Sequence, residues 1–355
     1  MFNPVSRLIG IACIAVLLSG CNSLSYYGQA ISGHMDLVSR ERPIDDMLKD
    51  KATTDALKHK LQLALDARAF ASNQIGLPDN GSYKSYADLG RPYAVWNVIA
   101  TPQYSIETKQ WCFLVVGCLS YRGYFDQQKA QSLATDLRAQ GMDVIVSGAA
   151  AYSTLGWMDD PLLNTVVVRS DASMVGIIFH ELAHQVIYVD GDSAFNEAFA
   201  TAIEYEGLRR WYVMQKNEQA YVQYREKKSQ QQMIYQQLES TRTRLNAIYQ
   251  QAIPDAEKQR LKQLEFAELK AWYQNWRKAH NYGGFDDWMS KELNNAHLAL
   301  IATYQQMVPD FLSALQSVDG DMNKFYNLVK AMAPLDTNQR RKQLAAYRVH
   351  QQAIK

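Results

Sequence analysis

The chain has 355 residues, of which 47% are hydrophobic and 21% are charged. This length and apolar content suffice for one large domain or two modest domains with a packed core, and they exclude global disorder. Lys and Arg number 37 against 36 Asp and Glu, and no long basic run occurs, so we expect no nucleic-acid partner.

The N-terminal residues have the layout of an export signal. Arg7 precedes an apolar run at residues 8–20, which is too short and too weakly flanked for a membrane-spanning helix. The run ends in "LSGC", which resembles the lipobox of bacterial lipoproteins, in which the cysteine becomes the lipidated first residue. We therefore expect residues 1–20 to be removed and Cys21 to carry a lipid. The alternative is an ordinary signal peptide whose cleavage site abuts a cysteine.

Asn22 follows the lipobox cysteine. Within the lipoprotein family, Asn rather than Asp at this place favours sorting to the outer membrane. We therefore expect a protein of the bacterial cell envelope, held by its lipid anchor at the periplasmic face of the outer membrane.

Two further cysteines of the mature chain, Cys112 and Cys118, lie close together in the sequence. In an oxidising compartment such a pair most simply forms a disulfide across a short turn. The rival interpretation is a pair of zinc ligands, which would need two more Cys or His ligands nearby that the sequence does not offer. We expect the disulfide.

The first half of the mature chain alternates between helix and strand patterns. Apolar residues at helical spacing after cap candidates predict helices, and β-branched or aromatic runs between Pro and Gly predict strands. The predicted helices cover 53–73 and 126–141, and the predicted strands cover 93–100, 111–117, 142–148 and 162–169.

The second half is helical in pattern. Residues 205–280 contain no convincing strand, and Leu238, Leu245 and Tyr249 recur at roughly heptad spacing. Pro254 interrupts this run, which predicts a long antiparallel helical hairpin.

We expect Trp272 and Trp276 of this hairpin to be buried packing residues, and a last helical segment over 291–349. The predicted fold is α+β and predominantly helical, with a small mixed sheet. Its expected parts are an α+β part of the catalytic domain at 21–204, the hairpin at 205–280, and C-terminal helices at 281–355 that complete the catalytic domain.

The stretch "FHELAHQ" contains the H-E-x-x-H pattern. Residues 170–189 predict a mostly buried helix, on which His180 and His184 lie one turn apart on one face and can reach one ion. Glu181 projects about 100° round the helix, where it would not bind a metal directly but could take a proton from a water held there.

A third ligand is available in "FNEAFATAIEYEG". Glu197 lies on a second helical pattern, and the turn "YVDGDS" could fold it back over the first helix. The alternative is that Asn196 and Glu197 face solvent near a helix start, where carboxylates are favoured. Their apolar neighbours, such as Phe195 and Phe199, argue against that alternative, because burial of an unpaired carboxylate is costly.

Residues 180–184 and 196–207 resemble the gluzincin metallopeptidases of the thermolysin group. This resemblance implies a gluzincin-like core, Zn²⁺ as the cofactor and a peptide or protein as the substrate. It implies His180, His184 and Glu197 as zinc ligands and Glu181 as the general base. It also draws attention to two residues that could orient a ligand, Asn196 and Glu204, whereas Glu206 falls on the opposite side of the helix.

Most of the mature chain, including "CFLVVGCLSYRGYFD" and "NNAHLALIATY", resembles a family of bacterial envelope lipoproteins named putative aminopeptidases. The chain departs from well-understood aminopeptidases in a shorter gap between His184 and Glu197 and in the lack of a Gly-x-Met-Glu-Asn segment. The stretch "GAAAYSTLGW" is a candidate edge strand for pairing with a substrate peptide. Gluzincins often stabilise the oxyanion with a downstream Tyr or His, and Tyr304 and His297 are the candidates here.

The resulting hypothesis is a zinc-dependent peptidase, with an aminopeptidase implied by the resemblance and an endopeptidase as the other possibility. An envelope scaffold or adaptor with a structural or inactive zinc site is the alternative function, since the hairpin offers a surface for a protein partner. A structural zinc ion usually has four protein ligands, and the sequence offers three, which favours the enzyme.

Overall fold

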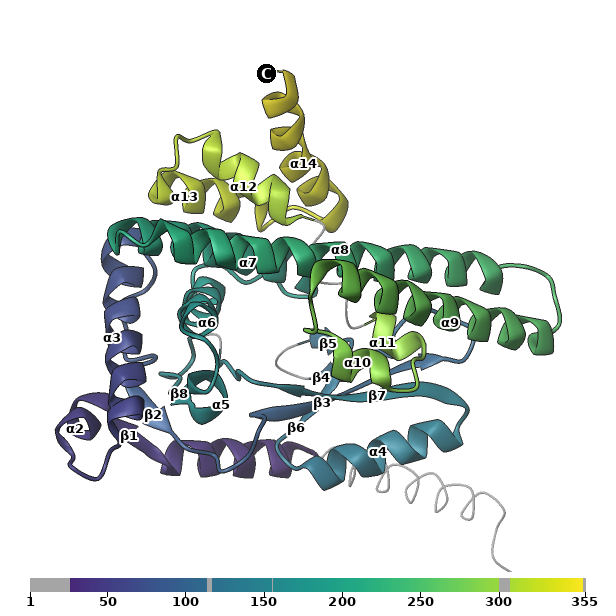
Figure 1. Ribbon diagram of the computed structural model, residues 1–355, viewed down its shortest axis with the longest axis horizontal. Coiled ribbons are helices and arrows are strands. Elements are labelled where there is room, and N and C mark those ends of the chain that lie inside the picture. Colours follow the sequence, from purple (N-terminus) through teal and green to yellow (C-terminus); the bar gives the residue numbers. More distant parts are fainter. Residues whose placement is uncertain (1–25, 114–116, 155, 300–306, 354–355) are drawn as a thin grey trace, which may run out of the picture.

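The computed structural model describes residues 26–113, 117–154, 156–299 and 307–353, and within them the protein is a mostly helical α+β structure with small sheets (Figure 1). This confirms the predicted fold class at that level. The helices of the first half are 26–39, α2 (Ile44–Lys49), α3 (Asp55–Ile75), α4 (Gln127–Ala139), α5 (Asn164–Val167) and α6 (Asp171–His184). The later helices are α7 (Ser193–Met214), α8 (Glu218–Tyr249), α9 (Asp255–His280), α10 (Asp286–Ser290), α11 (Asn295–Ala299), α12 (Val308–Gln316), α13 (Met322–Met332) and α14 (Thr337–Ala353).

Eight short strands make up the sheets of the described residues. The strands β6 (Arg122–Tyr124), β3 (Val95–Pro102) and β7 (Met142–Ala149) form one sheet in that order. A second sheet has the order β1 (Glu41–Pro43), β2 (Ser85–Ala87), β8 (Leu162–Leu163), and β4 (Trp111–Phe113) pairs with β5 (Gly117–Leu119). Among the described helices, none is both long and apolar enough to cross a membrane.

The predicted strand at 162–169 is wrong beyond its first two residues. The chain leaves the sheet at Asn164, where α5 begins. The side chain of Asn164 accepts a hydrogen bond from the N–H of Leu89 at 3.0 Å and donates one to the carbonyl of Arg91 at 3.1 Å. Val166 is buried within the helical turn, so packing here overrides the β propensity of the valine run.

The predicted strand at 111–117 is instead the hairpin of β4 and β5, with residues 114–116 outside the described part of the chain. Cys112 lies opposite Cys118 in this hairpin, and the two form a disulfide. The predicted disulfide is therefore confirmed.

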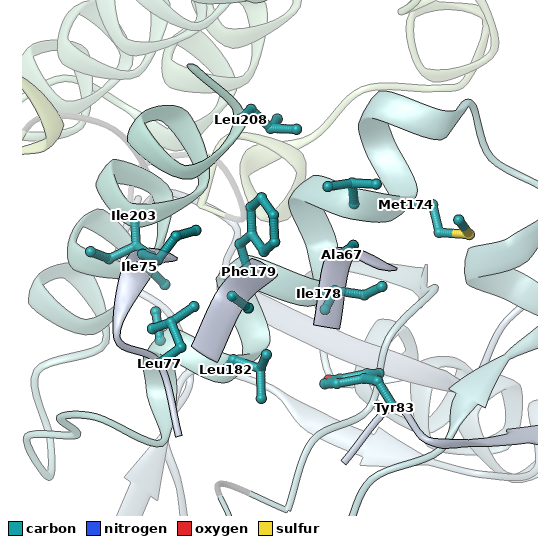
Figure 2. Packing of buried hydrophobic residues seen from close by; sticks show 14 of the residues in the cluster. Ala67, Ile75, Leu77, Tyr83, Met174, Ile178, Phe179, Leu182, Ile203 and Leu208 are labelled. Atoms are coloured by element: carbon teal, nitrogen blue, oxygen red, sulfur yellow. The ribbon is translucent and has the colours of Figure 1, made fainter. Parts of the chain in front are cut away.

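Helix α6 lies in the main core between α3 and α7 (Figure 2). Ile178, Phe179 and Leu182 of α6 are fully buried. Helix α7 can approach this closely because it carries Gly207, where a Cβ atom would lie 2.7 Å from the ring of Phe179. On the outer side of α7, Phe199 contacts Phe311 of α12, with ring centroids 5.7 Å apart. These contacts fix α6 and α7 relative to each other.

The predicted helical hairpin consists of α8 and α9, and its start is corrected from residue 205 to Glu218 (Figure 1). Helix α7 runs through residue 205, and the chain turns at Lys216, which has a φ of 52°. Asn217 then caps α8 by accepting a hydrogen bond from the N–H of Ala220 at 3.2 Å.

The hairpin packs around a second hydrophobic core, to which residues of α10 and α11 also contribute. It contains buried residues from both helices, Leu238, Leu245, Tyr249, Leu269, Tyr273 and Trp276, and Trp272 packs against them. The packing role predicted for Trp272 and Trp276 is thus confirmed. The hairpin is tied to β7 by the ammonium of Lys262, which lies 2.5 Å from the carboxylate of Asp143.

Candidate metal centre

Helix α6 presents two imidazoles from its last turn. Ser170 caps its start. The helix was predicted to continue to residue 189, but it ends at His184. The Nε2 atoms of His180 and His184 lie 3.3 Å apart, as the one-turn spacing predicts.

The turn between α6 and α7 is held by Asn196. Its side chain accepts a hydrogen bond from the N–H of Val189 at 2.9 Å and donates one to the carbonyl of Val189 at 2.8 Å. Asp192 caps α7 and pairs with the buried guanidinium of Arg340 at 3.1 Å. This fixed turn brings Glu197, the next residue, over the last turn of α6.

Glu197 completes a triangle of ligand atoms. Its Oε2 lies 3.3 Å from Nε2 of His180, and its Oε1 lies 3.7 Å from Nε2 of His184. The three residues form a group whose ligand atoms all lie within 4.8 Å of one another. The structure therefore brings together the three predicted metal ligands. The alternative, in which Asn196 and Glu197 face solvent, would not place Glu197 beside the two imidazoles.

The triangle fits a zinc ion. Two ligand atoms on a tetrahedral zinc ion with bonds of about 2.0–2.2 Å lie about 3.3–3.6 Å apart. The measured separations of 3.3 Å and 3.7 Å agree with this edge length. Two imidazoles and one carboxylate are also a donor set that zinc accepts, with a fourth position left for solvent or substrate.

Glu204 lies behind His180, as its place on the α7 face predicts. Its Oε2 is 3.6 Å from Nδ1 of His180. Two residues of α8 hold the other carboxylate oxygen, because Tyr224 donates a hydrogen bond to it at 3.0 Å and the ammonium of Lys228 lies 3.0 Å away. Glu206 lies on the opposite side of α7 and pairs instead with Arg209 and Arg210 of its own helix.

The charges of this cluster are strongly coupled. Burial would lower the pKa of His180, but hydrogen bonds to Glu197 and Glu204 raise that pKa to about 10. Burial lowers the pKa of His184 to about 4, and the charge of His180 acts in the same direction. Burial opposes ionisation of Glu204, yet Lys228 and His180 lower its pKa to about 2. The carboxylates therefore favour the protonated form of His180, and His180 in turn favours their ionised forms.

The pKa of Glu181 shifts in the direction opposite to that of Glu204. Burial raises its pKa to about 7, with the charge of His180 as the main opposing influence. A carboxyl group with a pKa near neutrality can both accept and return a proton, which is what general acid–base chemistry at neutral pH requires.

These groups line a cavity with a volume of about 630 Å³ between α6, α7 and the β6–β3–β7 sheet. His180, Glu181, His184 and Glu197 form one wall. The remaining wall is rich in aromatic rings and includes Tyr26, Phe113, Tyr121, Phe125, Tyr152 and Tyr188. The cavity is large enough for several residues of an extended peptide and offers it apolar contact surface.

The stretch proposed as an edge strand also reaches this cavity. Its first residues, Gly148 and Ala149, end β7, which is an edge of its sheet. Ala149, Ala151 and Tyr152 line the cavity, although residues 150–154 belong to no strand.

The two residues predicted to stabilise an oxyanion have different outcomes. His297 is buried and lines a different cavity, next to Val144 and Ile145 of β7 and Lys291, and its Nδ1 lies 2.9 Å from the side-chain oxygen of Asn294. The structure does not bring it to the wall formed by His180. Tyr304 lies outside the described residues, as does the predicted lipidation site Cys21.

Sequence reasoning missed Tyr121, Tyr224 and Lys228. Tyr224 and Lys228 share one face of α8, one turn apart, but nothing in that spacing indicates that the face lies against Glu204. Tyr121 follows the disulfide hairpin in a short turn, where no periodic pattern exists to read.

A model of the family described as "Putative aminopeptidase" matches residues 25–344 of the chain. Searches of curated proteins and of solved structures return no significant match.

Proposed function

The chain belongs to the putative aminopeptidase family, and on that premise we propose that it is a zinc-dependent peptidase with a gluzincin-like site. The observation that carries the proposal is the triangle of His180, His184 and Glu197, with Glu181 beside it in the same cavity. Three protein ligands leave a zinc ion open to solvent or substrate, which distinguishes a catalytic site from a structural one.

Each residue of the site has a separate role in the proposed reaction. Zn²⁺ bound by His180, His184 and Glu197 would supply a Lewis acid that polarises a peptide carbonyl and lowers the pKa of water. Glu181 takes a proton from the attacking water and passes it to the leaving nitrogen. Glu204 holds the imidazole of His180 in the orientation that directs its Nε2 to the cavity.

The substitution Glu181→Gln tests the assignment of the base. The amide keeps the size of the side chain but cannot accept the proton, so peptide hydrolysis should fall by a factor of about 10² to 10⁴ while zinc content stays at that of the wild type. Glu257→Gln, an exposed carboxylate paired with Arg260 on α9, is the matched control and should leave both unchanged. Turnover by a zinc-loaded Glu181→Gln variant at the wild-type rate would refute the assignment.

An endopeptidase is the second candidate, and the composition of the cavity wall favours it. Among the described residues, the carboxylates that line the cavity are Glu181 and Glu197, and both have roles at the metal. The segments outside the described residues contain no Asp or Glu. A free amino terminus carries a positive charge that is costly to bury without a counter-charge, so an internal stretch of peptide suits this cavity better.

A matched pair of peptides separates the two candidates. The same apolar decapeptide is supplied with a free and with an acetylated amino terminus, and the products are identified by mass spectrometry. Internal cleavage of both peptides indicates an endopeptidase. Removal of the first residue from the free peptide alone indicates an aminopeptidase.

We also propose that the protein acts in the bacterial cell envelope, anchored at the periplasmic face of the outer membrane through lipid on Cys21. The proposal is motivated by the lipobox-like "LSGC" after an apolar run. Metabolic labelling with a fatty acid should mark the wild type and not Cys21→Ser, and equal labelling of both would contradict the anchor.

A further inference from the structure

The cavity has a second wall that carries no metal ligand. It comes from β3, from the turn between β5 and β6, and from the segment after β7, whereas the metal ligands come from α6 and α7. A peptide bound in the cavity would lie between the two walls. Groups on the second wall would therefore contact the substrate, and a hydrogen-bond donor among them could stabilise the oxygen atom at which negative charge develops during hydrolysis.

Tyr121 lies in the turn between β5 and β6 and lines the cavity. Its ring packs against a small buried cluster that includes Ile99 of β3, Ile145 of β7 and Ala299 of α11. The backing of the ring by two strands and a helix fixes its direction. A preorganised donor needs a side chain that is held in this way.

The charges of Glu197 and Glu181 affect the phenol of Tyr121. Burial is the main reason that its pKa rises to about 12, and the next influence is the charge of Glu197, with Glu181 also contributing. The phenol consequently keeps its proton at neutral pH and can donate a hydrogen bond.

We propose that Tyr121 is a catalytic residue that donates a hydrogen bond to the oxyanion of the tetrahedral intermediate. The inference rests on the proposed peptidase function. Water adds to the carbonyl carbon, the C=O π bond breaks, and its electron pair goes to the oxygen that faces Tyr121. The Tyr121 proton is shared and not transferred. The electron pair on the oxygen then re-forms the C=O bond as the C–N bond breaks. The C–N pair goes to the nitrogen, which takes the proton that Glu181 received from the water, and a carboxylic acid and an amine result.

Other tyrosines of the cavity are less suited to this role. Tyr152 is packed against Phe125, with ring centroids 5.0 Å apart, and Asp160 is the charge that affects its pKa. The pKa of Tyr188 is raised by burial and then by the charge of Asp190, a residue exposed to solvent, ahead of the charge of Glu197. Tyr121 is the one of these three for which Glu197 is the leading charge.

The variant Tyr121→Phe tests the proposal, because it keeps the ring and its packing and removes only the donor. Tyr104→Phe is the matched control, because the ring of Tyr104 packs against the hairpin core and does not line the cavity. We expect kcat of Tyr121→Phe to fall by a factor of about 10² to 10³ with KM within about threefold of the wild type, and zinc content to be unchanged. A phosphinic peptide that mimics the tetrahedral intermediate should bind Tyr121→Phe more weakly by about the same factor.

Three results would overturn the inference. If Glu181→Gln is inactive while Tyr121→Phe keeps kcat within about threefold of the wild type, the peptidase assignment stands and the role of Tyr121 does not. If Tyr304→Phe loses activity and Tyr121→Phe does not, that tyrosine is the donor. Retained activity of zinc-loaded Glu181→Gln would remove the proposed function, and with it this role for Tyr121.

Discussion

At the proposed metal site, His180 is the residue for which a proton and the metal ion would compete. In the metal-free protein its carboxylate partners keep it protonated up to a pH of about 10, since their attraction outweighs the effect of burial on its pKa. An imidazole binds a metal only in its neutral form. The raised pKa therefore opposes zinc binding at neutral pH, while the same two carboxylates attract the ion.

This competition gives a pH-dependent prediction. Between the ordinary histidine pKa of about 6.5 and a pH of about 10, zinc binding should release one proton from His180, and the apparent affinity should rise about tenfold per pH unit. Calorimetric titration with zinc in buffers of different ionisation enthalpy measures the proton count. The variant Glu204→Gln should move the fall in proton release to lower pH, because His180 then keeps fewer carboxylate partners, and an unchanged pH profile of proton release would contradict the role of Glu204.

The metal ligands were predictable at the residue scale because they are local. His180 and His184 are one helical turn apart, and Glu197 stands in an apolar helical pattern directly after a turn. Tyr121 and Lys228 reach the site through tertiary packing, and single-sequence periodicity contains no information about which face of one element meets another. His297 shows the converse error, since a suitable side chain was assigned to a site that the fold places elsewhere.

At the scale of elements, α8 connects the helical hairpin to the metal centre. Lys228 and Tyr224 hold Glu204, and Glu204 holds His180. The hairpin therefore contacts the candidate metal site and also offers a surface of its own.

Lys228→Met should weaken metal binding. The substitution keeps most of the side-chain volume and removes the positive charge that stabilises ionised Glu204, so we expect zinc affinity to fall by a factor of about 10 to 100. The neighbouring Lys227 is exposed on α8, and Lys227→Met is the matched control. Competition with a fluorescent zinc chelator measures both, and equal affinities would show that α8 does not act on the site.

The elements themselves were predicted with uneven success. Helix α4 lies within the predicted range 126–141, because its ends are set by local chemistry: Asp126 caps its start, and Gly141, with a φ of 78°, follows its end. The valine run after Leu163 was assigned to a strand, and the side chain of Asn164 overrides that preference through hydrogen bonds to a distant loop. The hairpin was recognised, but its start was not, because α7 and α8 share a helical composition and differ only at the short turn around Lys216.

At the scale of the whole molecule, we expect the fold not to depend on the metal. The core around α6 and α7 is apolar and continuous, and the hairpin has a separate core. The proposed metal ligands lie at the edge of the main core, and the ion does not take the place of apolar packing. Two cores of this kind distinguish the protein from small domains in which the ion itself holds the chain together.

Chelation should therefore inactivate the protein without unfolding it. We expect the circular dichroism spectrum to be retained after zinc removal, the melting temperature to fall, and both melting temperature and hydrolysis to return when zinc is added. Zinc at about 100 times its dissociation constant adds about 2.7 kcal/mol to the free energy of unfolding. Loss of helical structure on chelation would instead indicate a structural ion.

The most direct measurement is a crystal structure of the zinc-loaded protein with diffraction data collected on both sides of the zinc absorption edge. The account predicts one anomalous peak bonded to Nε2 of His180, Nε2 of His184 and the carboxylate of Glu197, at about 2.0–2.2 Å, with no fourth protein ligand. A peak that lies elsewhere, or an ion closed off by a fourth side chain, would contradict it.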